Sequence, residues 1–295
     1  MATTIGVVGL GAMGSRIARR LCGAGYRVVV WNRSPEAITA VTAAGALPAQ
    51  SPAEVARRAD AVITMVSEAG ALAQVLDGPE GILAEPSVDL IQMSTIGVQA
   101  TAQLSERLPS SVNLLDAPVL GSIAEAEQGT LTVLMSGPSM LVGRWADHLA
   151  PLGTIIDLGH TGAGTAAKLV ANAALFGTVS LLGEVLALAK ALKLPRDKSF
   201  EVLGATPLAA QAKRRRPVIE SRQYPPRFTL ALAHKDACLV SDAAAAVGTD
   251  LRLLEAARYW LASAYEAGLG EADYTAVLSQ IGAHWETTPS DETSS

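Results

Sequence analysis

The hydrophobic positions in the first half of the chain fall in short β-branched and aliphatic runs, and Ala-rich segments with helical spacing separate these runs. Alternation of this kind predicts an α/β fold, with a doubly wound sheet covered by helices on both faces. The runs are TIGVV at 4–8, YRVVVW at 26–31, AVITMV at 61–66, VDLIQM at 88–93, VNLLDAP at 112–118, TLTVLM at 130–135 and TIIDLG at 154–159.

The second half of the chain shows no such runs after Gly164, because Ala and Leu dominate it. This pattern predicts an all-helical domain. Its first helix should extend from Thr165 to about Leu192, about 40 Å, and join the two domains. The run KRRR at 213–216 is most simply a solvated helix end or loop. We expect breaks between helices at LPRD (194–197), PVIESRQYPP (217–226), AVGTD (246–250) and GLGEAD (268–273).

Composition narrows the class of protein. The 23 basic and 28 acidic residues leave a net charge of −5 with no basic arm, which argues against a nucleic-acid partner and favours a small-molecule one. Cys22 and Cys238 lack metal-ligand spacing, so we expect free thiols in a reducing cytosol and no metal. The N-terminus has no signal-peptide pattern, and the apolar run at 169–182 contains Asn172, so we expect a cytoplasmic protein without a membrane span.

The motif GLGAMG lies between the first two hydrophobic runs, at residues 9–14. With a strand before it and a helix and a second strand after it, the βαβ unit of a dinucleotide site is complete. Gly9 permits the tight turn, Gly11 lets backbone amides approach a pyrophosphate, and Gly14 allows close packing of helix on strand. The sequence therefore predicts a Rossmann domain whose cofactor loop is formed by Gly9, Leu10, Gly11, Ala12, Met13 and Gly14.

The second strand is followed by Asn32, Arg33 and Ser34, where an NAD site would carry a carboxylate for the ribose hydroxyls. An arginine attracts a 2′-phosphate, whereas a carboxylate would repel it. These three residues are therefore predicted to bind the cofactor, and they favour NADP(H) over NAD(H).

Lys168 is the only charged residue between His160 and Glu184. It lies four residues before Asn172, so both side chains share one face of the expected helix. An ammonium buried without a partner costs several kcal/mol of free energy or loses its proton, which brings the pKa of a lysine within reach of working pH. Lys168 is thus a candidate acid or base, the alternative being that it reaches solvent and has no role.

Five motifs follow one another between residues 9 and 237: GLGAMG, MSTIG, DAPVLGSIAEAEQGTL, GAGTAAKLVAN and FTLALAHKDA. Together they resemble the β-hydroxyacid dehydrogenase family, which includes 3-hydroxyisobutyrate dehydrogenase and the glyoxylate and succinic semialdehyde reductases. The resemblance implies a Rossmann domain (1–161), a helical substrate and dimerisation domain (162–285) and an active site in the cleft between them. The residues 286–295 are expected to be a disordered tail, and a homodimer is expected through the helical half.

The resemblance also implies roles for single residues. Lys168 would protonate the carbonyl oxygen as hydride arrives, or accept the hydroxyl proton in oxidation. Asn172 would hold the substrate or the lysine, and Thr95 would lie beside both nicotinamide and substrate. Lys235 would reach over the cofactor.

Further family positions lie around this centre. Phe228 and Asp236 would help to close the site on the substrate. Val66 and Ser67 resemble the family's loop against the cofactor.

The turn DAPVLGS ends in Gly121 and Ser122, whose backbone amides and hydroxyl suit an anionic substrate group. The chain departs from many family members here, since Leu120 stands where serine is common and Ala171 where asparagine is common. Leu120 favours a bulkier or less polar substrate, although a hydrophobic pocket discriminates by only about 1–3 kcal/mol per methylene.

These observations predict an NADP-dependent reductase of a small aldehyde or keto acid, reversible as a 3-hydroxyacid dehydrogenase. Two alternatives remain open. An imine reductase or reductive aminase shares the architecture but usually has aspartate or tyrosine in place of Lys168. A non-catalytic dinucleotide-binding protein would be expected to lack the lysine or to carry an additional domain.

Overall fold

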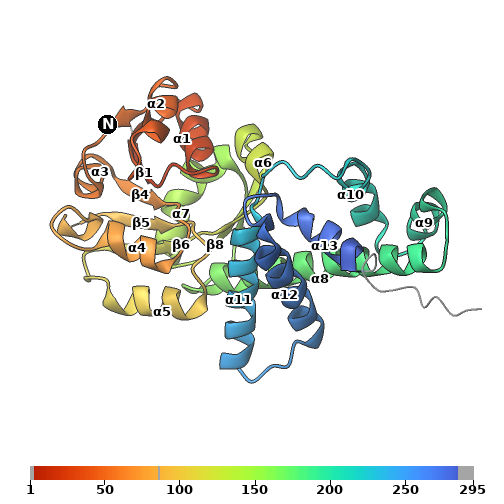
Figure 1. Cartoon of the computed structure of the whole chain (residues 1–295). Coiled ribbons are helices and arrows are strands. Elements are labelled where there is room, and N and C mark those ends of the chain that lie inside the picture. The colour runs from red at the N-terminus through yellow and green to blue at the C-terminus, as the bar shows by residue number, and fades with distance from the viewer. Residues whose placement is uncertain (1–2, 86, 285–295) are drawn as a thin grey trace, which may run out of the picture. The chain divides into compact units, whose positions relative to one another are not determined.

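The computed structural model describes residues 3–85 and 87–284. The chain divides into two compact units, Met1–Leu169 and Val170–Ser295, and helix α8 (Ala163–Ala191) contributes residues to both (Figure 1). The helix expected from Thr165 to Leu192 is therefore confirmed with slightly shifted ends. The tail expected at 286–295 lies outside the described residues.

The first unit alternates strands and helices. Its strands are β1 (Thr4–Val8), β2 (Arg27–Trp31), β3 (Leu47–Pro48), β4 (Ala61–Thr64), β5 (Asp89–Gln92), β6 (Asn113–Asp116), β7 (Val119–Leu120), β8 (Leu131–Met135) and β9 (Gly153–Asp157). Its helices are α1 (Gly14–Gly23), α2 (Glu36–Thr42), α3 (Pro52–Arg58), α4 (Ala69–Leu76), α5 (Val98–Arg107), α6 (Ile123–Gln128) and α7 (Ser139–Leu149), with short 3₁₀ turns η1 (Ile82–Ala84) and η2 (Ala150–Leu152).

Six parallel strands form the main sheet, in the order β3-β2-β1-β4-β5-β6. Alternate residues of one strand point to opposite faces, and both faces are buried. Along β1, Val7 packs in one hydrophobic cluster with Ile17 of α1, whereas Val8 packs in the other with Val55 of α3. This two-sided burial explains why the strands appear in the sequence as nearly continuous hydrophobic runs, and it confirms the doubly wound prediction.

The last two predicted strands do not belong to this main sheet. They form a second sheet in the order β7-β8-β9, in which β7 runs antiparallel to β8. The turn after Asp116 reverses the chain, and a single antiparallel bridge joins Asp116 to Ser136. The short strands β3 and β7 were not predicted, since two residues are too few for a periodic pattern.

The second unit contains helices and no strand among its described residues. Its helices are α9 (Arg196–Leu203), α10 (Ala209–Ser221), α11 (Leu230–Ala246), α12 (Arg252–Ala264) and α13 (Val277–His284), with a π turn η3 (Tyr265–Leu269) and a 3₁₀ turn η4 (Tyr274–Ala276). Its core gathers Phe176 and Val179 of α8 with Leu230 of α11, Leu261 of α12 and Ile281 of α13. The all-helical prediction is therefore confirmed.

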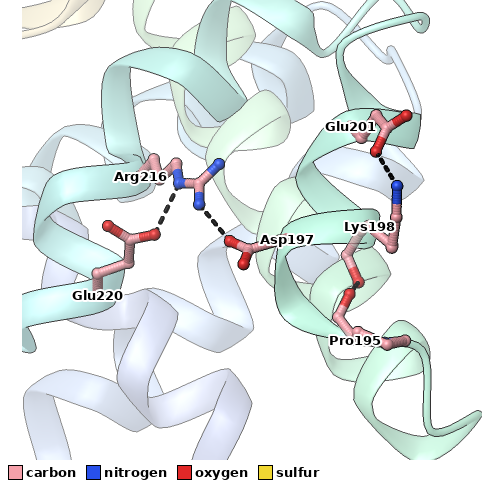
Figure 2. Close-up of polar contacts among 7 residues, drawn as sticks. Pro195, Asp197, Lys198, Glu201, Arg216 and Glu220 are labelled. Carbon is pink, nitrogen blue, oxygen red and sulfur yellow. Dashed lines mark hydrogen bonds and ion pairs between the residues drawn. The ribbon is translucent and has the colours of Figure 1, made fainter.

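One predicted break is wrong. Helix α10 continues through Pro217 to Ser221, so the loop begins later than the proline indicates. The run KRRR likewise lies inside this helix rather than at its end. Arg216 pairs with Glu220 one turn on and with Asp197 of α9, as Figure 2 shows, and it stacks over Phe200. These contacts hold the turn that contains the proline, whose ring removes one helical hydrogen bond.

Helix α8 is the one helix within residues 3–85 and 87–284 that has the length and apolarity of a membrane span. Its residues Phe176, Val179 and Leu182 are almost completely buried against other helices of the second unit. This burial is typical of the central helix of a helical domain, as the sequence predicts.

Candidate dinucleotide and catalytic site

The glycine loop connects β1 to α1 with a geometry that only glycine tolerates at two positions. Gly9 has φ +95°, and a Cβ there would lie 2.3 Å from the carbonyl oxygen of Met65. A Cβ at Gly14 would lie 1.9 Å from the carbonyl oxygen of Gly9. At the exposed Gly11, by contrast, a Cβ would meet no protein atom within 4 Å. The loop therefore leaves an open cradle at Gly11, next to the first turn of α1, which fits a pyrophosphate.

Asn32 ties the end of β2 to this loop. Its Oδ1 accepts a hydrogen bond of 2.9 Å from the amide of Leu10, and its Nδ2 donates one of 3.0 Å to the carbonyl of Ser34. The side chain of Asn32 therefore holds the backbone of this turn in place, whereas Arg33 and Ser34 are exposed to solvent. This position at the end of β2 is the one where a Rossmann domain contacts the adenosine ribose.

Val66 and Thr95 follow the carboxyl ends of β4 and β5, the two strands that succeed β1 in the sheet. Ser94 connects them, because its hydroxyl accepts a hydrogen bond of 2.8 Å from the amide of Val66 and donates one of 3.2 Å to the carbonyl of Thr64. Ser67 is exposed and Thr95 half-buried. The topology thus brings these residues to the same edge of the sheet as the glycine loop, where ligands of such sheets bind.

Lys168 lies in the second turn of α8, and its side chain is half-buried. Its Nζ donates a hydrogen bond of 2.8 Å to the carbonyl oxygen of Val119. Val119 begins β7, directly after the segment that leaves the carboxyl end of β6. The ammonium group therefore has a protein partner on β7, although the side chain is not fully buried.

The turn after β7 differs from expectation. Gly121 has φ +120°, and a Cβ there would lie 2.7 Å from Leu131, so glycine is required. The amide of Ser122 donates a hydrogen bond of 2.8 Å to the carboxylate of Glu125, as part of the cap of α6. The expectation that both amides are open to an anion is therefore wrong for Ser122, while Gly121 is exposed.

The site residues predicted in the second unit form a polar group of their own. The amide of Asn172 donates a hydrogen bond of 2.9 Å to Asp236 Oδ2, and Lys235 Nζ lies 2.8 Å from Asp236 Oδ1. Asn172 and Asp236 are each 3% exposed, so the carboxylate is held by an amide and an ammonium away from water. Phe228 stacks on Phe176 with ring centroids 6.5 Å apart.

Some residues that shape the site were not predicted. Ser94 orients Val66, and the buried carboxylate of Asp116 binds the start of α8. Asp116 had a usable signal, since a charged residue directly follows the apolar pair Leu114 and Leu115 at the end of β6. Ser94 had none, because its partners are known only once β4 and β5 lie side by side.

Comparison with known proteins identifies the chain. The family model described as the NAD binding domain of 6-phosphogluconate dehydrogenase matches residues 4–162. The model described as NAD-binding of NADP-dependent 3-hydroxyisobutyrate dehydrogenase matches residues 162–281. The chain belongs to the 3-hydroxyisobutyrate dehydrogenase-like β-hydroxyacid dehydrogenases, and it is an oxidoreductase that uses a nicotinamide dinucleotide.

Individual relatives share most of their length with this chain. The chain is 32% identical to 3-sulfolactaldehyde reductase of Escherichia coli over 94% of its own length and 95% of the relative's. The structure of 3-hydroxyisobutyrate dehydrogenase from Mycobacterium tuberculosis with L-serine superimposes with a TM-score of 0.85 at 29% identity, covering 95% of this chain and 99% of that one. An imine reductase from Pseudomonas sp. reaches a TM-score of 0.61 at 26% identity, covering 95% and 100% of the two chains.

Proposed function

We propose that the protein is an NADP(H)-dependent reductase of a small aldehyde or keto acid, which in reverse oxidises a 3-hydroxy acid, with Lys168 as general acid and base. The observation that carries the proposal is the half-buried ammonium of Lys168 hydrogen-bonded to the carbonyl of Val119. A charged donor held beside the predicted nicotinamide edge of the sheet suits protonation of a carbonyl oxygen.

The proposed reaction assigns hydride transfer to the cofactor and proton transfer to Lys168. The nicotinamide, when bound, supplies or accepts the hydride. Lys168 donates a proton to the substrate oxygen during reduction and takes one from the hydroxyl during oxidation. The Val119 carbonyl restricts the flexible lysine side chain to one direction, which reduces the entropy that would otherwise be lost when the substrate binds.

The preference for NADP(H) is supported by the turn after β2. Asn32 is committed to the amide of Leu10, and Arg33 is exposed directly after it. No carboxylate stands at 32–34 to bind the ribose hydroxyls or repel a phosphate. Arg33 would pair with the 2′-phosphate through a charge-assisted, bidentate hydrogen bond.

The substrate is proposed to be small and to carry an anionic group. Gly121, an exposed residue, lies in the turn that leads from β7 to α6, and the half-buried Leu120 precedes it. The name of the relative 3-sulfolactaldehyde reductase supports the same substrate class. Thr95 and the side-chain hydroxyl of Ser122 are proposed to contact the substrate, while the Ser122 amide is bound to Glu125. Asn172, Phe228, Lys235 and Asp236 are proposed to keep the roles expected from the sequence. The proposed domains are residues 1–161 and 162–285.

A homodimer through the helical domain is proposed on the basis of exposed apolar side chains. Leu181, Leu188 and Leu192 lie at spacings of seven and four residues along and just beyond α8, and they are 37%, 54% and 72% exposed. An exposed apolar stripe of this kind is typical of an interface between subunits. We propose a cytoplasmic location for the enzyme.

A substrate screen tests the proposal. The purified protein is assayed with succinic semialdehyde, glyoxylate and a cyclic imine, each with NADPH and with NADH, by following the reduced nicotinamide. Turnover of an aldehyde or keto acid with NADPH is expected. Turnover of the imine alone would favour an imine reductase, which Lys168 argues against, and binding of NADPH without any turnover would favour a non-catalytic protein.

A further inference from the structure

A completely buried carboxylate, Asp116, lies at the N-terminus of α8. It is 0% exposed. Its Oδ2 accepts hydrogen bonds from the Thr165 amide at 2.8 Å and the Ser136 hydroxyl at 3.2 Å. Its Oδ1 accepts a bond of 2.7 Å from the Thr165 hydroxyl. The Ser136 hydroxyl in turn accepts from the Gly164 amide at 2.9 Å, so two amides of the first turn of α8 are held by this pair of side chains.

Burial has the larger effect on the ionisation of Asp116, so the pKa of its carboxyl is raised overall. Burial raises the pKa of the Asp116 carboxyl, while the hydrogen bonds from Thr165 and Ser136 oppose that rise. The N-terminus of a 29-residue helix presents unpaired amides and a partial positive charge to the carboxylate. The carboxyl of Asp116 therefore binds the start of α8 through the oriented amide and hydroxyl of Thr165.

The first turn of α8 lies so close to the strands that residue 164 has no space for a side chain. A Cβ at Gly164 would lie 2.4 Å from the carbonyl oxygen of Leu134 and 2.9 Å from that of Asp116. The helix start thus lies directly against the backbone of two strands. A shift of α8 along its axis would lengthen the hydrogen bonds between Thr165 and Asp116.

The segment 116–119 makes a second contact with α8. Three residues after Asp116, the carbonyl of Val119 accepts the hydrogen bond of Lys168. Thr165 and Lys168 are also three residues apart, so they lie on one face of α8. Residues 116–119 therefore contact this face at two points one turn apart, first through a carboxylate and then through a carbonyl.

The network extends toward the predicted nicotinamide edge. The hydroxyl of Thr165 lies 3.1 Å from that of Thr101 on α5, and Thr101 also bonds the carbonyl of Gly97 at 3.0 Å. Gly97 begins the turn of α5 two residues after Thr95. A continuous set of buried side chains thus joins the Thr95 turn, the start of α8 and the segment that binds Lys168.

We propose that Asp116, acting through Thr165, is a positioning residue. It fixes the position of the first turns of α8 along and around the helix axis, and thereby the position of the Lys168 ammonium. The inference rests on the proposed function of Lys168 as proton donor. Asp116 touches neither substrate nor cofactor in this role. Its effect is exerted through the helix.

Thr165→Val tests this role, because valine keeps the shape of threonine and removes the hydroxyl. We expect turnover to fall about 10- to 100-fold, which is the effect of displacing a reacting group by about 1 Å. The KM for NADPH should stay within about threefold of the wild-type value. Thr165→Ser, which restores the hydroxyl, should recover most of the turnover. Thr178→Val is the matched control, since the Thr178 hydroxyl bonds only its own helix, at the carbonyls of Ala174 and Leu175.

A double-mutant cycle separates this inference from the proposed function. In a Lys168→Ala background the further loss caused by Thr165→Val should disappear, because the hydroxyl acts through the lysine. An equal loss in both backgrounds, or wild-type turnover of Thr165→Val, overturns the positioning role while the function of Lys168 stands. Wild-type turnover of Lys168→Ala instead overturns the proposed function.

A second variant and a structural readout keep the test decisive if Thr165→Val folds poorly. Ser136→Ala removes the other hydroxyl at the helix start, and the same cycle applies to it. A crystal structure of either variant should show Lys168 Nζ displaced from the Val119 carbonyl, compared with 2.8 Å in the wild type. An unchanged distance in both variants overturns the inference, whatever their activity.

Discussion

The ammonium nitrogen of Lys168 lies 2.8 Å from the carbonyl oxygen of Val119, and it donates a hydrogen bond to this acceptor from 49 residues further along the chain. The bond connects the long helix α8 to the short strand β7 within the first unit. It leaves a charged group half-buried at the edge of the sheet where the cofactor is proposed to bind.

Lys168→Ala should lower kcat by about 10²- to 10⁴-fold, the usual contribution of general acid–base assistance. The dissociation constant for NADPH, measured by fluorescence titration, should not change, because Lys168 is not assigned to the cofactor. Lys213→Ala, which removes an exposed lysine of α10, is the control and should keep wild-type turnover. A Lys168→Ala enzyme with normal kcat would contradict the assignment.

Arg33→Ala should raise the KM for NADPH by about tenfold or more, since a charge-assisted bond to phosphate contributes about 1.5–3 kcal/mol. The KM for NADH should change little, because NADH has no 2′-phosphate. Arg27→Ala is a matched control, as this exposed arginine begins the same strand that Arg33 follows. Equal effects on both cofactors would argue against a role in phosphate recognition.

Two glycines of the same loop should respond differently to alanine. Gly14→Ala places a Cβ 1.9 Å from the Gly9 carbonyl, so we expect a lower melting temperature and poor folding. Gly11→Ala places its Cβ in open space, so the melting temperature should stay near wild type while NADPH binding weakens severely. Normal binding by Gly11→Ala would show that the pyrophosphate does not occupy this cradle.

Asp236→Ala should destabilise the second unit, because it removes the acceptor of Asn172 and the partner of Lys235. An unsatisfied buried polar group costs about 1–3 kcal/mol in the free energy of unfolding. Denaturant unfolding measures the loss. Asp242→Ala, an exposed position one and a half turns along the same helix, should change stability by no more than about 0.5 kcal/mol. Equal stabilities of the two variants would mean that the buried carboxylate contributes nothing to the fold.

The raised pKa of Asp116 predicts a dependence of stability on pH. Burial disfavours the ionised carboxylate in the folded protein, so the pKa of Asp116 is higher there than its ordinary value of 3.8. The protonated carboxyl therefore contributes to the free energy of unfolding, fully below pH 3.8, and this contribution is lost as pH rises through the folded-state pKa. Asp116→Asn cannot ionise. Urea unfolding of both proteins should be measured from about pH 3 to about pH 7. As pH rises, the free energy of unfolding of Asp116→Asn should increase relative to that of the wild type. A difference that stays constant would mean that the carboxyl titrates alike in both states.

The sequence by itself determined the order of strands and helices, the glycine loop and the position of Arg33. These features depend on neighbouring residues, through side-chain periodicity, turn conformation and the reach of one βαβ unit. The motifs also pointed to the family and to Lys168. The sequence did not predict that α10 continues through Pro217. The contacts of Arg216 that support this turn are with Asp197 and Phe200, which lie on another helix.

Only the tertiary structure decided the partners of the buried polar groups. A helical spacing shows that Lys168 and Asn172 share a face, but it cannot show that one meets the Val119 carbonyl and the other meets Asp236, 64 residues away. Asp116 and Thr165 are likewise 49 residues apart. Such pairs form only where strands and helices distant in sequence pack together, since a buried charge or amide is stable only when its partner is brought to it.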